Sequence, residues 1–366
     1  MKMLTLHRYL GLLSGLAVFV VAITGCLYAF QEEILDATED FRHVKPCDAP
    51  LLPPSRLIAQ AEAELPGKHL HSLEYGEPGR SAVALFYADG AEPYYYKTYL
   101  DPYTGAVLRT KDMKSGFFAW VLDGHMHLWL PEEIGRVVVM ASTIVFVVML
   151  LTGFVLWLPK KVKYLKQRLT FRWKPTTKWK RKNWDLHAIG GIYSLAFGLI
   201  FAVTGLVYVL PGWAELYHRL VGGEKSMAYV EPTVDVPAAT AEGEGERLDR
   251  LFTAYADVPA TGTSVELHPP VTDSSSVLVV TNPDPGTYWR SDYVYYDPYT
   301  RAEEPVDHVY GRYAEADLAD KVLRLNYDIH VGAALGWPGK VLACLASLVI
   351  AGLVVTGLLL WWGRGR

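Results

Sequence analysis

The stretch VVVMASTIVFVVMLLTGFVLWL, residues 137–158, contains no charged residue over 22 positions. Since a helix rises about 1.5 Å per residue, about 20 apolar residues cross the roughly 30 Å hydrocarbon core of a bilayer. Three further uncharged stretches have this length and character: residues 9–30, 188–210 and 341–362. The sequence therefore predicts four transmembrane helices.

Polar segments separate these stretches and define the domain organisation of the 366-residue chain. The predicted parts are residues 1–30 (first helix), 31–130 (first polar domain), 131–159 (second helix), 160–184 (basic loop), 185–211 (third helix), 212–329 (second polar domain) and 330–366 (fourth helix and tail). Cys26, Cys47 and Cys344 form no Cys-x-x-Cys pair, and we predict no disulfide framework from them.

The loop between the second and third helices predicts the orientation. Residues 160–182 contain eleven Lys or Arg and no Asp or Glu. Short basic loops remain in the cytoplasm, so both termini are expected inside and both polar domains outside, in the periplasm of a Gram-negative cell. A basic loop held between two spans is expected to touch anionic lipid, and nucleic-acid binding is not predicted.

An internal repeat relates the two halves of the sequence. His7-Arg-Tyr-Leu-Gly11 with Thr24-Gly25 lies 180 residues before His187-Ala-Ile-Gly-Gly191 with Thr204-Gly205. The motif Thr152-Gly-Phe-Val-Leu-Trp157 lies 204 residues before Thr356-Gly-Leu-Leu-Leu-Trp361. Although Ile23-Thr24-Gly25-Cys26 resembles a lipoprotein signal, Thr-Gly recurs in every span and is assigned to the helices. The pattern predicts a tandem duplication with parallel repeats.

The polar domains carry the same elements in the same order. Each has a predicted short helix, two predicted strands and an Asp-Pro-Tyr-Thr turn, where Pro presets φ and Gly allows positive φ. The helices are residues 55–64 and 247–255, and the strands are 82–87, 94–100, 276–280 and 293–296. Each polar domain is therefore predicted to be a small α+β unit. Arg301 replaces the Gly found at position 105, which predicts a distorted second turn.

Histidines at the ends of the spans are the candidate cofactor ligands, because a titratable residue in a membrane helix marks function by default. His7 and His187 belong to one pair, at the cytoplasmic ends of the first and third helices. His125 or His127, with His330, forms the other pair at the outer ends of the second and fourth helices. Facing histidines in a four-helix bundle are how such folds hold a cofactor in their core.

Two bis-histidine haems are the predicted cofactors, with His7, His187, His125 and His330 as iron ligands. Gly11 and Gly191 follow their histidines by one turn and are expected to leave space for a flat ring. His125 and His127 point about 200° apart on a helix, so only one is expected to ligate, and the alignment with His330 favours His125. The remaining histidines are predicted to be surface residues: His43, His69, His71, His218, His268 and His308.

The ordered set of these motifs resembles the PepSY-associated transmembrane family, often called iron-regulated membrane proteins. The matching segments begin at His7-Arg-Tyr-Leu-Gly-Leu, at His125, at His187, and at Ile329-His330-Val-Gly332, and the two Asp-Pro-Tyr-Thr segments look like PepSY domains. The resemblance covers nearly the whole chain. It implies two b-type haems and reduction of ferric chelates, such as ferric siderophores, in the periplasm.

The predicted function is therefore an electron conduit across the inner membrane, with no general acid, base or nucleophile. No Gly-x-Gly-x-x-Gly follows a predicted strand, so electrons are expected from quinol or a cytoplasmic reductase. The alternative is a non-enzymatic PepSY protein that regulates a peptidase or assists an iron transporter, and it predicts no haem. A transporter is a weaker alternative, because the spans lack acidic residues and broken-helix signals.

Overall fold

The computed structural model describes residues 2–47, 49–90, 92–238 and 242–363. These residues form two compact units, which are treated separately below. The bundle comprises the described residues of Met1–Glu32, Phe117–Ala214 and Asn326–Arg366. The sheet unit comprises those of Glu33–Gly116 and Glu215–Leu325.

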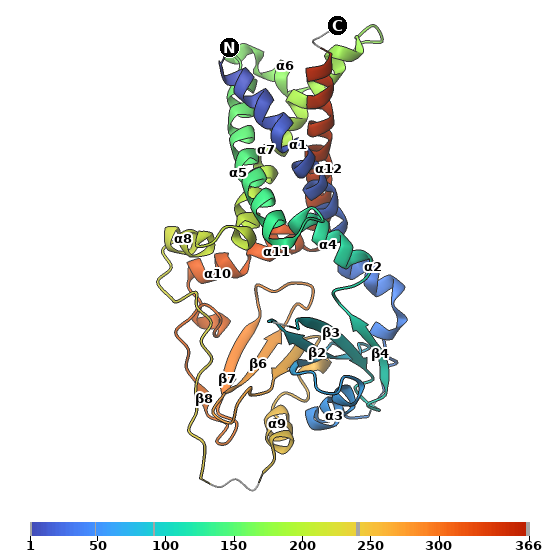
Figure 1. Cartoon of the computed structure of the whole chain (residues 1–366), viewed down its shortest axis with the longest axis vertical. Coiled ribbons are helices and arrows are strands. Elements are labelled where there is room, and N and C mark those ends of the chain that lie inside the picture. The colour runs from blue at the N-terminus through green and yellow to red at the C-terminus, as the bar shows by residue number, and fades with distance from the viewer. Residues whose placement is uncertain (1, 48, 91, 239–241, 364–366) are drawn as a thin grey trace. The chain divides into compact units, whose positions relative to one another are not determined.

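Four long helices form the bundle, and each is long and apolar enough to cross a membrane (Figure 1). They are α1 (Lys2–Tyr28), α5 (Glu132–Trp157), α7 (Trp179–Val209) and α12 (Gly336–Trp362). Helix α1 packs against α5 and α12, and α7 packs against the same two helices, so the four close into a ring. The prediction of four membrane helices is confirmed.

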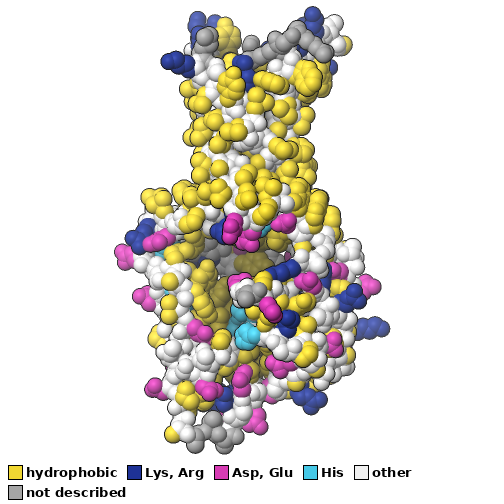
Figure 2. Space-filling view, in the orientation of Figure 1, with side chains coloured by type: hydrophobic (Ala, Val, Ile, Leu, Met, Phe, Trp, Pro, Cys, Tyr) yellow, Lys and Arg dark blue, Asp and Glu magenta, His cyan; other side chains and the backbone are white. Residues whose placement is uncertain are grey.

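Small residues face the middle of the bundle, and large apolar residues face outward. Ser14, Ala202, Ala343 and Ala346 are buried, whereas Leu13 is 79% exposed. Hydrophobic side chains cover the visible face of the bundle in Figure 2, with Lys and Arg near its upper end. An apolar exterior around a small-residue interior is the arrangement expected of helices that pack in lipid.

Both described ends of the chain lie at one end of the bundle, together with the short helix α6 (Leu165–Leu169) (Figure 1). We call this the terminal end. The opposite, linker end carries the connections to the sheet unit and two short helices, α4 (Phe117–His127) and α11 (Asn326–His330). Because α4 belongs to the bundle, the boundary of the sheet unit lies at residue 116 and not at the predicted residue 130.

The structure also joins two helices of the bundle by a disulfide that the sequence analysis did not predict. Cys26 of α1 and Cys344 of α12 have Cα atoms 4.6 Å apart. The two cysteines are 318 residues apart in sequence, so their proximity arises only from the packing of α1 against α12. Cys47 is free and exposed.

The sheet unit contains one antiparallel sheet with the strand order β4-β3-β2-β1-β5-β6-β7-β8. The strands are β1 (Leu70–Tyr75), β2 (Ala82–Ala88), β3 (Tyr94–Leu100), β4 (Val107–Asp112), β5 (Ser264–His268), β6 (Val277–Asn282), β7 (Asp292–Tyr296) and β8 (Glu303–Glu304). The predicted strands are confirmed within two residues. The prediction of two separate α+β domains is wrong, because β1 pairs with β5 and joins both segments into one sheet.

One hydrophobic core covers one face of this sheet. Helices α3 (Pro54–Glu64) and α9 (Glu244–Phe252) pack together there, and Leu57 of α3 is buried in the same core as Leu73 and Leu267 of the sheet. Joining the two segments also pairs the strands β1 and β5, which two separate domains would leave as open sheet edges. The repeated polar segments therefore share one sheet and one core.

The two Asp-Pro-Tyr-Thr turns have the same structure. Asp101 Oδ1 accepts a hydrogen bond from the Tyr103 backbone N–H at 2.8 Å, and Asp297 Oδ1 accepts one from Tyr299 at 2.7 Å. Gly105 has φ +75° and Arg301 has φ +64°. The predicted distortion is wrong, because Arg301 takes the left-handed conformation that the turn requires despite its side chain.

Candidate cofactor-binding site

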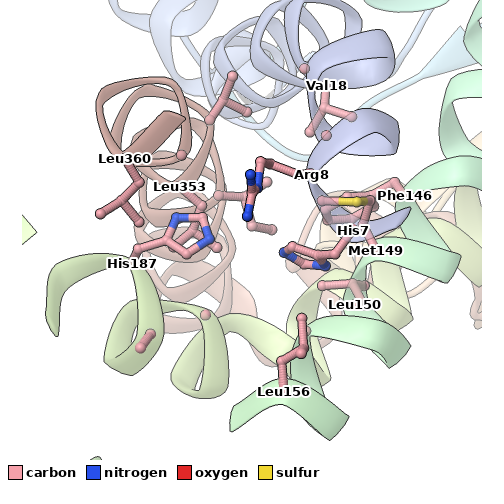
Figure 3. A pocket seen from close by; sticks show the side chains of 18 of the residues that line it. His7, Arg8, Val18, Phe146, Met149, Leu150, Leu156, His187, Leu353 and Leu360 are labelled. Carbon is pink, nitrogen blue, oxygen red and sulfur yellow. The ribbon is translucent and has the colours of Figure 1, made fainter. Parts of the chain in front are cut away.

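The structure brings His7 and His187 together at the terminal end of the bundle. His7 lies near the start of α1 and His187 lies on α7. Their ring centroids are 6.4 Å apart and their planes are inclined by 84°. Both side chains point into the interior of the bundle, from helices that occupy equivalent places in the sequence repeat (Figure 3).

The second pair lies at the linker end and consists of His125 and His330. Their ring centroids are 6.2 Å apart, with an angle of 73° between the planes. His125 comes from α4 and His330 from α11. The His127 ring instead lies beside its own helix, with Nδ1 3.0 Å from Asp123 Oδ1. The structure therefore places His125, and not His127, opposite His330.

Each of these four histidines has a threonine hydroxyl at Nδ1, and each threonine belongs to a Thr-Gly motif. The Nδ1–Oγ1 distances are 2.9 Å for His7–Thr152, 3.0 Å for His187–Thr356, 3.2 Å for His125–Thr24 and 2.8 Å for His330–Thr204. The contacts cross between helices. Histidines associated with α1 and α7 meet threonines on α5 and α12, and histidines on α4 and α11 meet threonines on α1 and α7.

The hydrogen bonds of these threonines determine the tautomer of each imidazole. Each Thr hydroxyl donates its one proton to the carbonyl four residues earlier, at distances of 2.6–2.9 Å. The Thr oxygen can then only accept from the histidine, so Nδ1 carries the proton and Nε2 carries the free lone pair. His125 supports this assignment independently, because its Nδ1 also lies 3.0 Å from the Val21 carbonyl oxygen, which can only accept.

The glycine of each motif makes room for the same imidazole. A Cβ atom at Gly153, Gly205 or Gly357 would lie 3.2–3.3 Å from Cε1 of the facing histidine, and at Gly25 the distance would be 2.9 Å. Any larger residue would push the ring aside. Thr-Gly therefore both orients and accommodates a histidine. The sequence analysis used Thr-Gly only to align the repeats, although its recurrence in every span was a signal for this role.

A cavity of about 400 Å³ surrounds the His7–His187 pair (Figure 3). Gly11 and Gly191 both line it. A Cβ atom at Gly11 would lie 2.8 Å from the Met149 methyl carbon, whereas at Gly191 its nearest contact would be an ordinary 4.0 Å. Most of the lining is leucine, valine and aromatic side chains.

Arg8 carries the one charged side chain among the described residues that line this cavity, if the histidines are counted as neutral. Its side chain points into the same cavity as the two imidazoles (Figure 3). Among the described residues that line the cavity there is no Asp or Glu. A mostly apolar cavity with two imidazoles and one guanidinium is suited to an apolar ligand that carries an anionic group.

The other histidines lie in the sheet unit. His218 is 1% exposed, and its Nε2 lies 2.9 Å from Asp320 Oδ1, which contradicts its prediction as a surface residue. Lys225 pairs with the other oxygen of Asp320 at 3.0 Å. This group is a buried ion-pair network between α8 (Trp213–Leu220) and α10 (Leu318–Arg324). His308 is also buried, whereas His43, His69 and His71 are exposed and His268 is partly exposed.

Together these features define a four-helix membrane protein whose bundle holds two pairs of facing histidines. The chain belongs to the family described as PepSY-associated TM region, whose model matches residues 4–364. This match confirms the resemblance found in the sequence. A search of curated proteins finds no match for this chain.

Proposed function

We propose that this protein is a di-haem b oxidoreductase of the bacterial inner membrane that reduces ferric chelates, such as ferric siderophores, in the periplasm. The supporting observation is a unit that occurs at both ends of the bundle: two facing imidazoles, each oriented by a threonine at Nδ1. His7 with His187 would hold one haem, and His125 with His330 would hold the other.

The separation within each pair fits two ligands on opposite sides of one iron. With metal–nitrogen bonds of about 2 Å, two imidazoles in line through a metal ion have ring centroids about 6.3 Å apart. The observed separations are 6.4 Å and 6.2 Å. The proton on Nδ1 leaves Nε2 free to ligate, and metal-binding histidines commonly use this second hydrogen bond to fix the ring.

The cavity at the terminal end also suits a haem. Its volume of about 400 Å³ lies within the range of small-molecule sites, which is about 300–1,000 Å³. Arg8 provides a cation for the carboxylate groups of a haem, in a lining that is otherwise mostly apolar. A haem held by two histidines would supply an iron that changes between Fe(III) and Fe(II) without an open position for oxygen, which suits electron transfer.

The charge distribution supports the direction of transfer. The eleven basic residues of 160–182 support a cytoplasmic position for the terminal end of the bundle. We therefore place the electron donor, quinol or a cytoplasmic reductase, at that end, and the sheet unit with the ferric chelate in the periplasm. Equivalent elements, turns and His–Thr contacts in both halves support a tandem duplication as the origin of the two sites.

The test is the absorption spectrum of the purified full-length protein. We expect a b-type α band in the dithionite-reduced minus oxidised difference spectrum and two haems per chain by the pyridine haemochrome assay. Adding ferric citrate or a ferric hydroxamate to the reduced protein should then abolish that band. A protein without haem after expression in haem-replete cells would contradict the proposal and favour a non-enzymatic PepSY protein.

A further inference from the structure

We infer that His71 and His268, with Glu266 beside them, form a binding site for a first-row divalent cation, lying wholly within the sheet unit. The cation class follows from the ligands, because imidazole nitrogen suits iron, nickel, copper and zinc in their divalent states. Fe(II) is the cation that the reductase would release, and its identification as the occupant rests on the proposed function.

The strand pairing brings the two histidines to the same face of the sheet. β1 and β5 pair with Leu73 opposite Leu267, and both leucines point into the core beneath α3 and α9. His268 is next to Leu267 in its strand, so it points to the other face. The register of β1 against β2 shifts between Leu70 and Ser72, and His71 is the extra residue. Such a bulge re-aims a side chain, and it brings the His71 ring against the His268 ring.

The geometry of this pair differs from that of the bundle pairs. The ring centroids of His71 and His268 are 4.9 Å apart, and the planes are perpendicular at 90°. Two imidazoles bound to one metal ion at an angle between 90° and about 109° have centroids about 4.5–5.1 Å apart. The bundle pairs, at 6.2–6.4 Å, match ligands on opposite sides of an iron. The His71–His268 pair instead matches adjacent ligands on one ion.

The nitrogen atoms of the pair are accessible to an ion from solution. Among the described residues, no hydrogen bond holds either ring nitrogen of His71, and its side chain is exposed. His268 Nε2 lies 3.5 Å from Glu266 Oε1, and these side chains are 20% and 31% exposed. Two imidazoles leave the remaining coordination positions to water, so we expect an exchangeable ion and not a closed structural site.

The test is equilibrium dialysis of the tag-free, full-length protein against Ni(II), with bound metal measured by elemental analysis. We expect saturable binding that is lost in His71→Gln and His268→Gln. His43→Gln is the matched control, because His43 also lies 3.5 Å from a carboxylate, that of Asp36, but is paired with no second histidine. Its Ni(II) binding should equal that of the wild type.

A measurement on the wild type removes any dependence on how the variants fold. Cu(II) bound at this site should give an electron paramagnetic resonance spectrum with superhyperfine splitting from two nitrogen ligands. Absence of saturable binding in the wild type, or binding retained in both His→Gln variants, would overturn the inference. The haem spectrum of the same samples separates this outcome from the proposed function, since Ni(II) binding does not require haem.

Discussion

The bundle and the sheet unit both contain histidines that are held by hydrogen bonds inside the fold, but they use different partners. The bundle histidines donate Nδ1–H to neutral threonine hydroxyls. In the sheet unit, His218 lies against the Asp320 carboxylate, which also pairs with Lys225. Asp320 engages Nε2 of His218 itself, whereas the threonines engage only Nδ1 and leave Nε2 of each bundle histidine free. The ring nitrogen that is engaged therefore distinguishes the buried His218 from the four bundle histidines.

The largest effect should come from removing a ligand of the bundle. His187→Ala and His330→Ala should each reduce haem content from two per chain to one, because each variant removes one of the two histidines that would hold one haem. The measurement is a pyridine haemochrome assay normalised to protein. His218→Ala is the control and should retain both haems. Loss of both haems, or of neither, in the two ligand variants would contradict the assignment of one haem to each histidine pair.

The sheet unit should lose stability when its buried ion pair is removed. Removing one partner of a buried ion pair costs about 3–5 kcal/mol, because the remaining charge is left without compensation. Asp320→Ala should therefore lower the free energy of unfolding by about this amount and leave the haem content unchanged. Glu215→Ala removes an exposed ion pair with Arg219 and should cost less than about 1 kcal/mol. Chemical denaturation followed by circular dichroism measures both.

The same network predicts a dependence on pH. Burial raises the pKa of the Asp320 carboxyl, but hydrogen bonds from His218 and Lys225 outweigh this effect and hold the pKa below its usual value. A carboxyl with a depressed pKa in the folded state stabilises the fold above its unfolded pKa. That contribution should disappear as the pH falls through the folded pKa, and Asp320→Asn should flatten this part of the stability curve.

A smaller effect should come from the threonines that orient the bundle histidines. Loss of a hydrogen-bond partner behind a metal ligand typically weakens metal binding about 10- to 100-fold. Thr152→Ala and Thr356→Ala should increase haem dissociation to apomyoglobin by such a factor, whereas Ser at either position should restore the wild-type rate. Thr143→Ala is the control, because Thr143 makes the same backbone hydrogen bond on α5 but contacts no histidine through its hydroxyl.

The smallest effect should come from the glycines. In Gly357→Ala the new Cβ would lie 3.3 Å from the His187 ring, so the ring must tilt by a few tenths of an ångström. We expect a small shift or broadening of the α band of one haem at unchanged haem content. Gly352→Ala on the same helix would meet no atom within 4 Å and should leave the spectrum as it is. Equal spectra for the two variants would show that Gly357 does not position His187.

Several parts of the fold could be predicted because they depend on local sequence. A span requires only an uninterrupted apolar stretch of sufficient length, and a strand requires alternation within a few residues. The pairing of His7 with His187 was predicted from the sequence repeat, since the two histidines hold the same position in two helices with the same motif. The Asp-Pro-Tyr-Thr turns were recognised for the same local reason, although the conformation of Arg301 was not.

The sequence by itself determined the four spans and the candidate histidine pairs. Only the tertiary structure decided that His125 and not His127 faces His330, that Thr-Gly holds each imidazole, and that β1 joins β5. These contacts link residues more than 100 positions apart, and each depends on the rotation of a helix about its axis or on the register of a strand. Rotating a helix by one residue, about 100°, or shifting a strand by one residue would replace every one of these neighbours. Only the packing of the folded chain selects one arrangement among these alternatives.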